Sequence, residues 1–244
     1  MGSSITFDTG YSCMKSIASK LMKKSVATLA FIALVGCETR NLNEPNPITN
    51  NIEVVAPSGI YRHDPTHSTL QFSVSHLGLS NYIGRFSEYS IEMVLDAEDI
   101  AASQVRVDIN PGIIRTDYRG DYKATHPESK FDSWEEDLAF SDKFFNSGLY
   151  PQISFISTNV KSVAGGKFTI TGNLTLLGTT QVIKLEGEVI GSTSEHPFMK
   201  QGAVGFSIYG RFKRSLFGMD FLLDPPLIGD EITVSYEGEM HEVR

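Results

Sequence analysis

Histidines offer the most direct metal or proton-transfer chemistry in this 244-residue chain. His63 and His67 stand four residues apart, a spacing that places two imidazoles on one helix face and can hold a zinc ion. Pro65 lies between them and a strand-like pattern follows, so the two imidazoles are not expected to share a helix face. We therefore predict no metal site.

Catalytic signatures are missing from the sequence. It contains no G-x-S-x-G, no G-x-x-x-x-G-K-S/T, no G-x-G-x-x-G and no H-E-x-x-H motif. The adjacent acids Glu135, Glu136 and Asp137 are expected to form a solvated face, because acid–base pairs need a cleft and separated pKa values. We predict that the protein is not an enzyme. A triad assembled only in the fold leaves no linear signature, so an enzyme stays as an alternative.

Two polar residues could hold the polar end of a ligand. His76 ends the apolar face of a predicted strand, where its imidazole could hydrogen-bond a carbonyl or a phosphate. Arg214 lies in a predicted loop, where its guanidinium could pair with an anionic head group. The simpler interpretations are a rim histidine bonded to backbone and a solvated surface charge.

Both cysteines precede the predicted folded part, so no disulfide and no cysteine-based metal site is expected within it. A lysine pair and an apolar run ending at Gly36 precede Cys37, as in a secretory signal peptide. The run is shorter than the roughly 20 apolar residues that span a bilayer. The final Leu-Val-Gly-Cys37 resembles the lipobox of bacterial lipoproteins, which implies a diacylglyceryl group on the Cys37 thiol.

The domain organisation follows from this segment. Residues 1–37 are predicted to be an upstream extension and a lipoprotein signal peptide. Residues 38–59 are rich in Asn and Pro without periodicity, which predicts a flexible tether. Residues 60–244 form the folded domain. Glu38 stands where the enterobacterial inner-membrane retention signal has Asp, so we expect a lipid-anchored envelope protein on the periplasmic face of the outer membrane.

Composition limits the partners. The formal net charge is −8 and the sequence pI is about 5.3, so the surface repels phosphate backbones and no nucleic acid is expected as partner. Hydrophobic residues make up 41% of the chain and there are fifteen Phe, enough for a sizeable core or a wide apolar interior.

From Tyr61 onward, apolar and polar residues alternate with a period of two, which predicts strands with one buried face. One-sided alternation favours antiparallel sheets. Eight such strands can bury their apolar faces in a barrel or a sandwich, and closure also removes exposed edges. A barrel of about this size can hold a small ligand. The strands are centred on residues 70–76, 91–95, 105–109, 153–155, 168–176, 183–189, 204–208 and 232–236.

Residues 115–150 break the alternation. They predict one or two short helices, the second of which Ser141 and Asp142 could cap. A helical insert between barrel strands would form a plug or lid at one mouth. Its apolar side is expected to consist of Leu138, Phe144 and Phe145.

Five motifs occur in order along the chain: His67 to Gly78, Gly84-Arg-Phe86, Ser141 to Thr158, Gly172 to Thr180, and Arg214 to Met219. Together they resemble the YceI family of polyisoprenoid-binding, lipocalin-like barrels, in which Gly-x-Phe is a turn. The resemblance covers roughly residues 60–240. It implies an all-β fold, an eight-stranded antiparallel lipocalin-like barrel with a short helical insert at one mouth.

The resemblance also implies a ligand. It points to a polyisoprenoid chain, such as a quinone tail or prenyl phosphate, or to a fatty-acid-like amphiphile; no cofactor is expected, and a homodimer stays open. Burial would supply affinity, at about 0.8 kcal/mol per CH₂. A filled core is the alternative for the same side chains. The expected ligand-binding residues are Phe72, Val74, His76, Phe86, Ile109, Phe145, Phe155, Leu174, Leu176, Phe206 and Arg214.

One departure from the family falls in the insert. Family members carry His-Leu where this sequence has Asp137-Leu138, and residues 117–134 form a longer, charged stretch. Recognition of the ligand's polar end is expected to differ there.

The sequence supports three hypotheses for the function of the protein: an envelope-anchored protein that carries, stores or sequesters a lipid; an enzyme acting on such a lipid; and a structural or stress lipoprotein with a filled barrel.

Overall fold

The computed structural model describes residues 53–244, and predictions about Cys37 and residues 1–37 lie outside them. The described part contains ten strands, two short α-helices and two 3-10 turns. The strands are β1 (Gly59–His76), β2 (Ser80–Phe86), β3 (Tyr89–Leu95), β4 (Gln104–Ile109), β5 (Ile114–Thr116), β6 (Ile153–Val163), β7 (Lys167–Leu176), β8 (Thr179–Thr193), β9 (Ala203–Lys213) and β10 (Ile228–Glu242). The helical elements are α1 (Tyr122–Thr125), α2 (Trp134–Phe140), η1 (Ile100–Ala102) and η2 (Arg214–Phe217).

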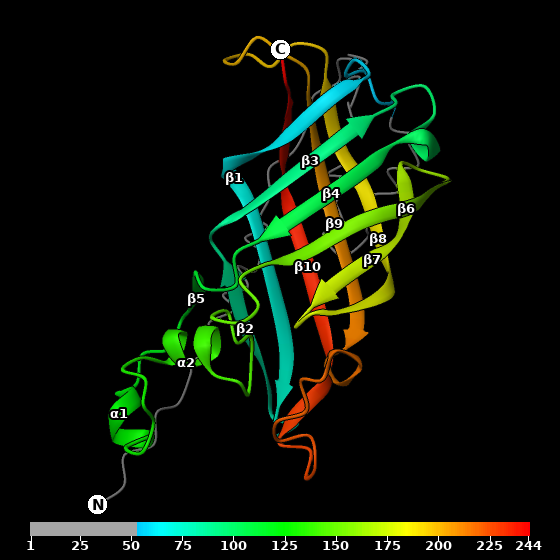
Figure 1. The fold of residues 1–244 in the computed structure, drawn as a ribbon. Coiled ribbons are helices and arrows are strands. Elements are labelled where there is room, and N and C mark those ends of the chain that lie inside the picture. Colours follow the sequence, from blue (N-terminus) through cyan, green and yellow to red (C-terminus); the bar gives the residue numbers. More distant parts are fainter. Residues whose placement is uncertain (1–52) are drawn as a thin grey trace, which may run out of the picture. The chain divides into compact units, whose positions relative to one another are not determined.

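Eight of these strands close into an antiparallel barrel, in the order β1-β3-β4-β6-β7-β8-β9-β10 and back to β1 (Figure 1). The predicted eight-stranded barrel is confirmed. Strand β1 closes the ring because it is long enough to pair with β10 along one edge and with two shorter strands along the other. Its first part, Gly59 to Arg62, pairs with β3, and its last part, Leu70 to His76, pairs with β2.

Strands β2 and β5 were not predicted, because neither shows a clear apolar alternation. Gly84 takes an inward position of β2, directly across from Phe72. A Cβ at Gly84 would lie 2.5 Å from Cζ of Phe72, so the glycine leaves room for the ring. The expectation that Gly84 to Phe86 form a turn is therefore wrong, since they are paired strand residues.

The insert between β5 and β6 contains α1 and α2, which lie at one end of the barrel near β2 (Figure 1). Ser133 caps α2 by accepting a hydrogen bond of 3.1 Å from the Glu136 N–H. Ser141 ends this helix: its N–H makes the last helical hydrogen bond, to the Asp137 carbonyl, and its own backbone is extended, with ψ at 142°. The predicted second helix beginning at Ser141 is wrong: the residues after it form turns that fold back on α2.

The residues just before β1 already pack on the barrel. Ala56 is buried, the Val55 N–H donates to Ser192 Oγ at 2.9 Å, and the Tyr61 hydroxyl donates to the Pro57 carbonyl at 2.6 Å. This stretch forms the end of the predicted tether. Within residues 53–244, no helix combines the length and apolar character needed to cross a membrane.

Candidate functional site

The barrel encloses a cavity of about 1080 Å³. Inward-facing side chains of β1, β3, β4, β6, β7, β8, β9 and β10 form its wall, together with residues of β2 and of the insert. This volume is at the upper limit of the ~300–1,000 Å³ typical of small-molecule sites. The interior is therefore not filled by side chains, which contradicts the alternative of a packed core.

The structure places all eleven predicted ligand-binding residues on the cavity wall, while their contact with a ligand stays a prediction. The apolar members come from β1, β2, β4, β6, β7, β9 and the turn after α2. The full set of eleven wall residues is Phe72, Val74, His76, Phe86, Ile109, Phe145, Phe155, Leu174, Leu176, Phe206 and Arg214.

Arg214 is not the solvated surface charge of the simpler interpretation, because its exposed fraction is 2%. Its Nε, Nη1 and Nη2 donate to the carbonyls of Gly229, Met219 and Ile228 at 2.8, 2.8 and 2.9 Å. Burial lowers its pKa, although the nearby charge of Asp230 opposes the shift. Arg214 thus clamps η2 to β10 and sets a cationic group at the cavity wall.

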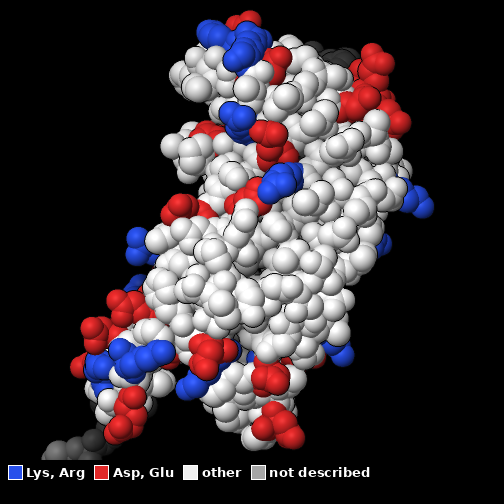
Figure 2. Space-filling model, viewed as in Figure 1, with Lys and Arg blue, Asp and Glu red and all other residues white. Residues whose placement is uncertain are grey.

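Polar side chains gather at the end of the cavity where the insert lies. His76, the last residue of β1, is exposed there, and Asn81, Asp117, Arg119 and His126 also line this end. Among the described residues, no carboxylate lies within 4.0 Å of Arg119. Figure 2 shows acidic and basic side chains intermixed at the end that carries the helices. This end is the polar mouth of the cavity.

An aromatic cluster builds one side of this mouth. The Trp134 indole N–H donates to the Tyr82 hydroxyl at 2.6 Å, and its ring lies 6.4 Å from that of Tyr118. Phe145 anchors the insert to the barrel, with ring centroids 5.7 Å from Phe72 and 5.5 Å from Phe86. The insert therefore forms part of the cavity wall at one mouth.

Sequence reasoning missed several residues of the mouth. The one signal for them was the unusual length and charge of the stretch after β5. The missed wall residues of this stretch are Asp117, Tyr118, Arg119, His126 and Trp134.

Asp137, which stands where family members carry a histidine, makes its contacts inside the insert. Asp137 is buried and accepts a hydrogen bond from the Tyr122 hydroxyl, and Ser129 Oγ lies 2.9 Å from the same hydroxyl. Burial, and then the hydrogen bond to Asp137, raise the pKa of Tyr122. Asp137 does not line the cavity, so any effect on a ligand would act through residues such as His126, which stacks on Tyr122 at 4.6 Å.

Comparison with known proteins agrees with the motif order and with this barrel. The model of the YceI-like domain matches residues 61–240. The chain belongs to the YceI family. A UPF0312 protein of Yersinia enterocolitica is 33% identical over 172 residues, which cover 70% of this chain and 81% of that protein.

Solved structures show the same barrel. The Campylobacter jejuni YCEI protein is 25% identical, with a TM-score of 0.56, over 70% of this chain and 90% of its own. A structure described as a polyisoprenoid binding domain from Saccharophagus degradans is 14% identical, with a TM-score of 0.52, over 75% of this chain and 98% of its own. The YceI domain of the present chain therefore has the fold that its motifs implied.

Proposed function

We propose that this protein is a lipid-binding protein that holds an isoprenoid-like chain in its barrel, for carriage, storage or sequestration. The observation that carries the proposal is the large cavity with a mainly apolar wall, whose charged and histidine side chains gather at one mouth. This separation fits a ligand with a long apolar tail and a small polar head. The polyisoprenoid-binding description of the S. degradans neighbour supports the same ligand class.

The wall chemistry supports binding rather than catalysis. Along the strands, the side chains that face the cavity are mainly aliphatic and aromatic. Tyr236 also lines this wall, and burial raises the pKa of its hydroxyl to about 12. The cationic and hydrogen-bonding groups, Arg119 and His76, lie at the mouth, where a quinone carbonyl or a prenyl phosphate would be placed.

Lipid extraction tests this proposal. The full chain purified from its native host should yield about one apolar lipid per chain by mass spectrometry. Leu174→Trp adds bulk at the cavity wall and should retain less of a lipid long enough to fill the cavity. The control Val182→Trp places the same side chain on the outer side of β8, where Val182 is 69% exposed, and should retain it.

Two results would count against lipid carriage. Absence of a stoichiometric lipid, together with failure to bind a prenyl quinone, would contradict binding. Chemical turnover of the bound lipid, lost on His76→Ala, would favour the enzyme alternative.

We also propose that the chain is anchored to the periplasmic face of the outer membrane through Cys37. The support is the local pattern of the apolar run and the Leu-Val-Gly-Cys37 motif. Labelled palmitate should be incorporated by the wild type and by Cys13→Ser, but not by Cys37→Ser. Equal labelling of all three would refute the anchor.

A further inference from the structure

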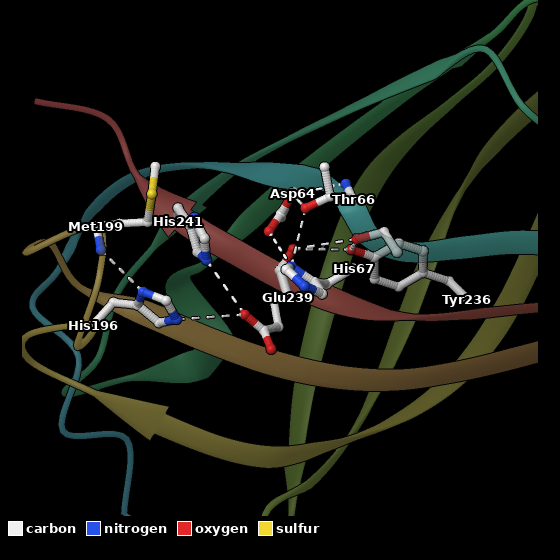
Figure 3. Close-up of polar contacts among 9 residues, drawn as sticks. Asp64, Thr66, His67, His196, Met199, Tyr236, Glu239 and His241 are labelled. Carbon is white, nitrogen blue, oxygen red and sulfur yellow. Dashed lines mark hydrogen bonds and ion pairs between the residues drawn. The ribbon is translucent and has the colours of Figure 1, made fainter.

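Three side chains with metal-ligand atoms converge on one another (Figure 3), near the end of the barrel that lies opposite the insert (Figure 1). Glu239 and His241 are two residues apart on β10, so both project to the same side of the strand, while Met240 between them is buried. His196 comes from the loop between β8 and β9. One ligand atom from each of the three lies within 4.8 Å of the other two.

Two separations in the cluster involve the Glu239 carboxylate, and both are close to the spacing of ligands around an ion. Nε2 of His241 lies 3.4 Å from Oε2 of Glu239, and Nε2 of His196 lies 3.9 Å from the same oxygen. These separations are too long for strong hydrogen bonds. Around a tetrahedral zinc ion with bonds of about 2.0–2.1 Å, ligand atoms lie about 3.3–3.4 Å apart. The two separations to Glu239 are therefore within about 0.6 Å of this value, and the two imidazole ligand atoms lie within 4.8 Å of each other.

The loop that carries His196 is tied down by backbone hydrogen bonds. The His196 N–H donates to the Gln201 carbonyl at 2.7 Å, and the Lys200 N–H donates to the His196 carbonyl at 2.9 Å. The Met199 N–H donates to Nδ1 of His196 at 3.2 Å, which leaves the proton on Nε2. To bind an ion through Nε2, His196 must carry its proton on Nδ1 instead. The exposed 3.2 Å hydrogen bond from the Met199 N–H is then lost.

A second imidazole–carboxylate pair lies beside the cluster. The register of β1 shifts between His63 and Ser68, which places Asp64 and His67 next to Glu239. Nδ1 of His67 lies 2.7 Å from Oδ2 of Asp64. Because this pair and the His196–His241 pair would both use the Glu239 carboxylate, we expect one ion per chain. Two imidazoles and one carboxylate suit a borderline ion better than one imidazole and two carboxylates.

We propose that His196, Glu239 and His241 bind one divalent transition-metal ion of the zinc class. None of the three lines the lipid cavity, so the proposal is independent of lipid binding. Two ring nitrogens and one carboxylate oxygen are a known zinc donor set, with water in the fourth position. Bound to all three, the ion would join the β8–β9 loop to β10.

Zinc titration by calorimetry tests the site. The full chain should carry Cys13→Ser and Cys37→Ser throughout, because thiolates would bind zinc themselves. One Zn²⁺ should bind per chain. His196→Ala, His241→Ala and Glu239→Gln should each weaken binding at least about tenfold. His126→Ala removes a histidine outside the cluster and should leave zinc affinity unchanged.

Thermal unfolding gives a second readout that separates ligand loss from misfolding. Without zinc, the three cluster variants should unfold cooperatively near the parent's Tm. Added zinc should raise the Tm of the parent and of His126→Ala, but not that of the cluster variants. The proposal is overturned if the parent binds no zinc, or if the cluster substitutions leave zinc affinity unchanged.

Discussion

Asp64 and His67 form an ion pair on β1, with 2.7 Å between Oδ2 and Nδ1. Burial opposes ionisation of Asp64, but hydrogen bonds from Thr66 and His67 outweigh it and lower the pKa of Asp64 well below its usual range. The hydrogen bond from His67 to Asp64, and then the charge of Asp64, raise the pKa of His67. The pair therefore links the stability of the barrel to pH.

We expect wild type to be more stable than Asp64→Asn, with the largest difference in stability between about pH 4 and 6.5. The contribution of Asp64 is present above its unfolded pKa and is lost as pH falls through the lower folded pKa. The contribution of His67 is complete below its unfolded pKa and is lost as pH rises through the higher folded pKa. Tm values of both proteins across pH would show this, and a pH-independent difference would refute it.

Gly172 on β7 contributes to the stability of the barrel because it has no side chain. A Cβ there would lie 2.6 Å from the carbonyl oxygen of Ile156 and also against the ring of Phe155. Gly→Ala at an unstrained site stabilises by about 0.4–1 kcal/mol, whereas overpacking costs about 1–3 kcal/mol. The overpacking cost is the larger of the two at this position.

Gly172→Ala should therefore lower the free energy of unfolding by about 1–2 kcal/mol. Urea unfolding measures this change. Gly59→Ala is the matched control, because a Cβ at Gly59 meets no atom within 4 Å. Equal stability of the two variants would show that the barrel relaxes around the added methyl group.

At the scale of elements, the insert between β5 and β6 determines the shape of the cavity mouth. It contributes the only tryptophan of the chain, Trp134, to the cavity wall. The Trp134 indole bonds to Tyr82 of β2, so the insert and the barrel meet through this residue. A ligand that reaches the mouth must change the surroundings of Trp134.

Binding of a prenyl quinone should change the fluorescence emission of Trp134. Trp134→Phe should abolish this signal. A control with Trp134→Phe and Val182→Trp carries its reporter on the outer side of β8 and should show no change. Tight binding by an independent method with unchanged Trp134 emission would show that the ligand does not reach the insert.

For the whole molecule, closure of the sheet by β1 and β10 creates one deep cavity rather than a surface groove. Inside such a cavity each buried CH₂ contributes about 0.8 kcal/mol, roughly a fourfold gain in affinity. The volume of about 1080 Å³ sets the point at which further chain can no longer be buried.

Affinity for a series of prenyl alcohols should rise with chain length and level off once the cavity is full. Calorimetry across the series measures this dependence. Leu174→Trp should shift the plateau to shorter chains, because it occupies part of the same space. An affinity that is independent of length would argue that the tail does not enter the barrel.

Local patterning was enough to predict the strands that alternate cleanly, because a period of two is a local property of the chain. The sequence also predicted the family for a similar reason, since the motifs keep their order along the chain. The apolar wall residues followed from this alternation: Phe72, Leu174 and Phe206 lie on apolar faces of β1, β7 and β9.

Features that depend on register and closure became visible only in the folded barrel. Gly84 gave no alternation signal, yet pairing with Phe72 makes its segment a strand. The simpler interpretation of Arg214 from the sequence was a solvated charge in a loop. In the fold, its guanidinium donates hydrogen bonds to three backbone carbonyls. His196 and Glu239 meet because β8, β9 and β10 are neighbours in a closed sheet, and such long-range pairing leaves no trace in local spacing.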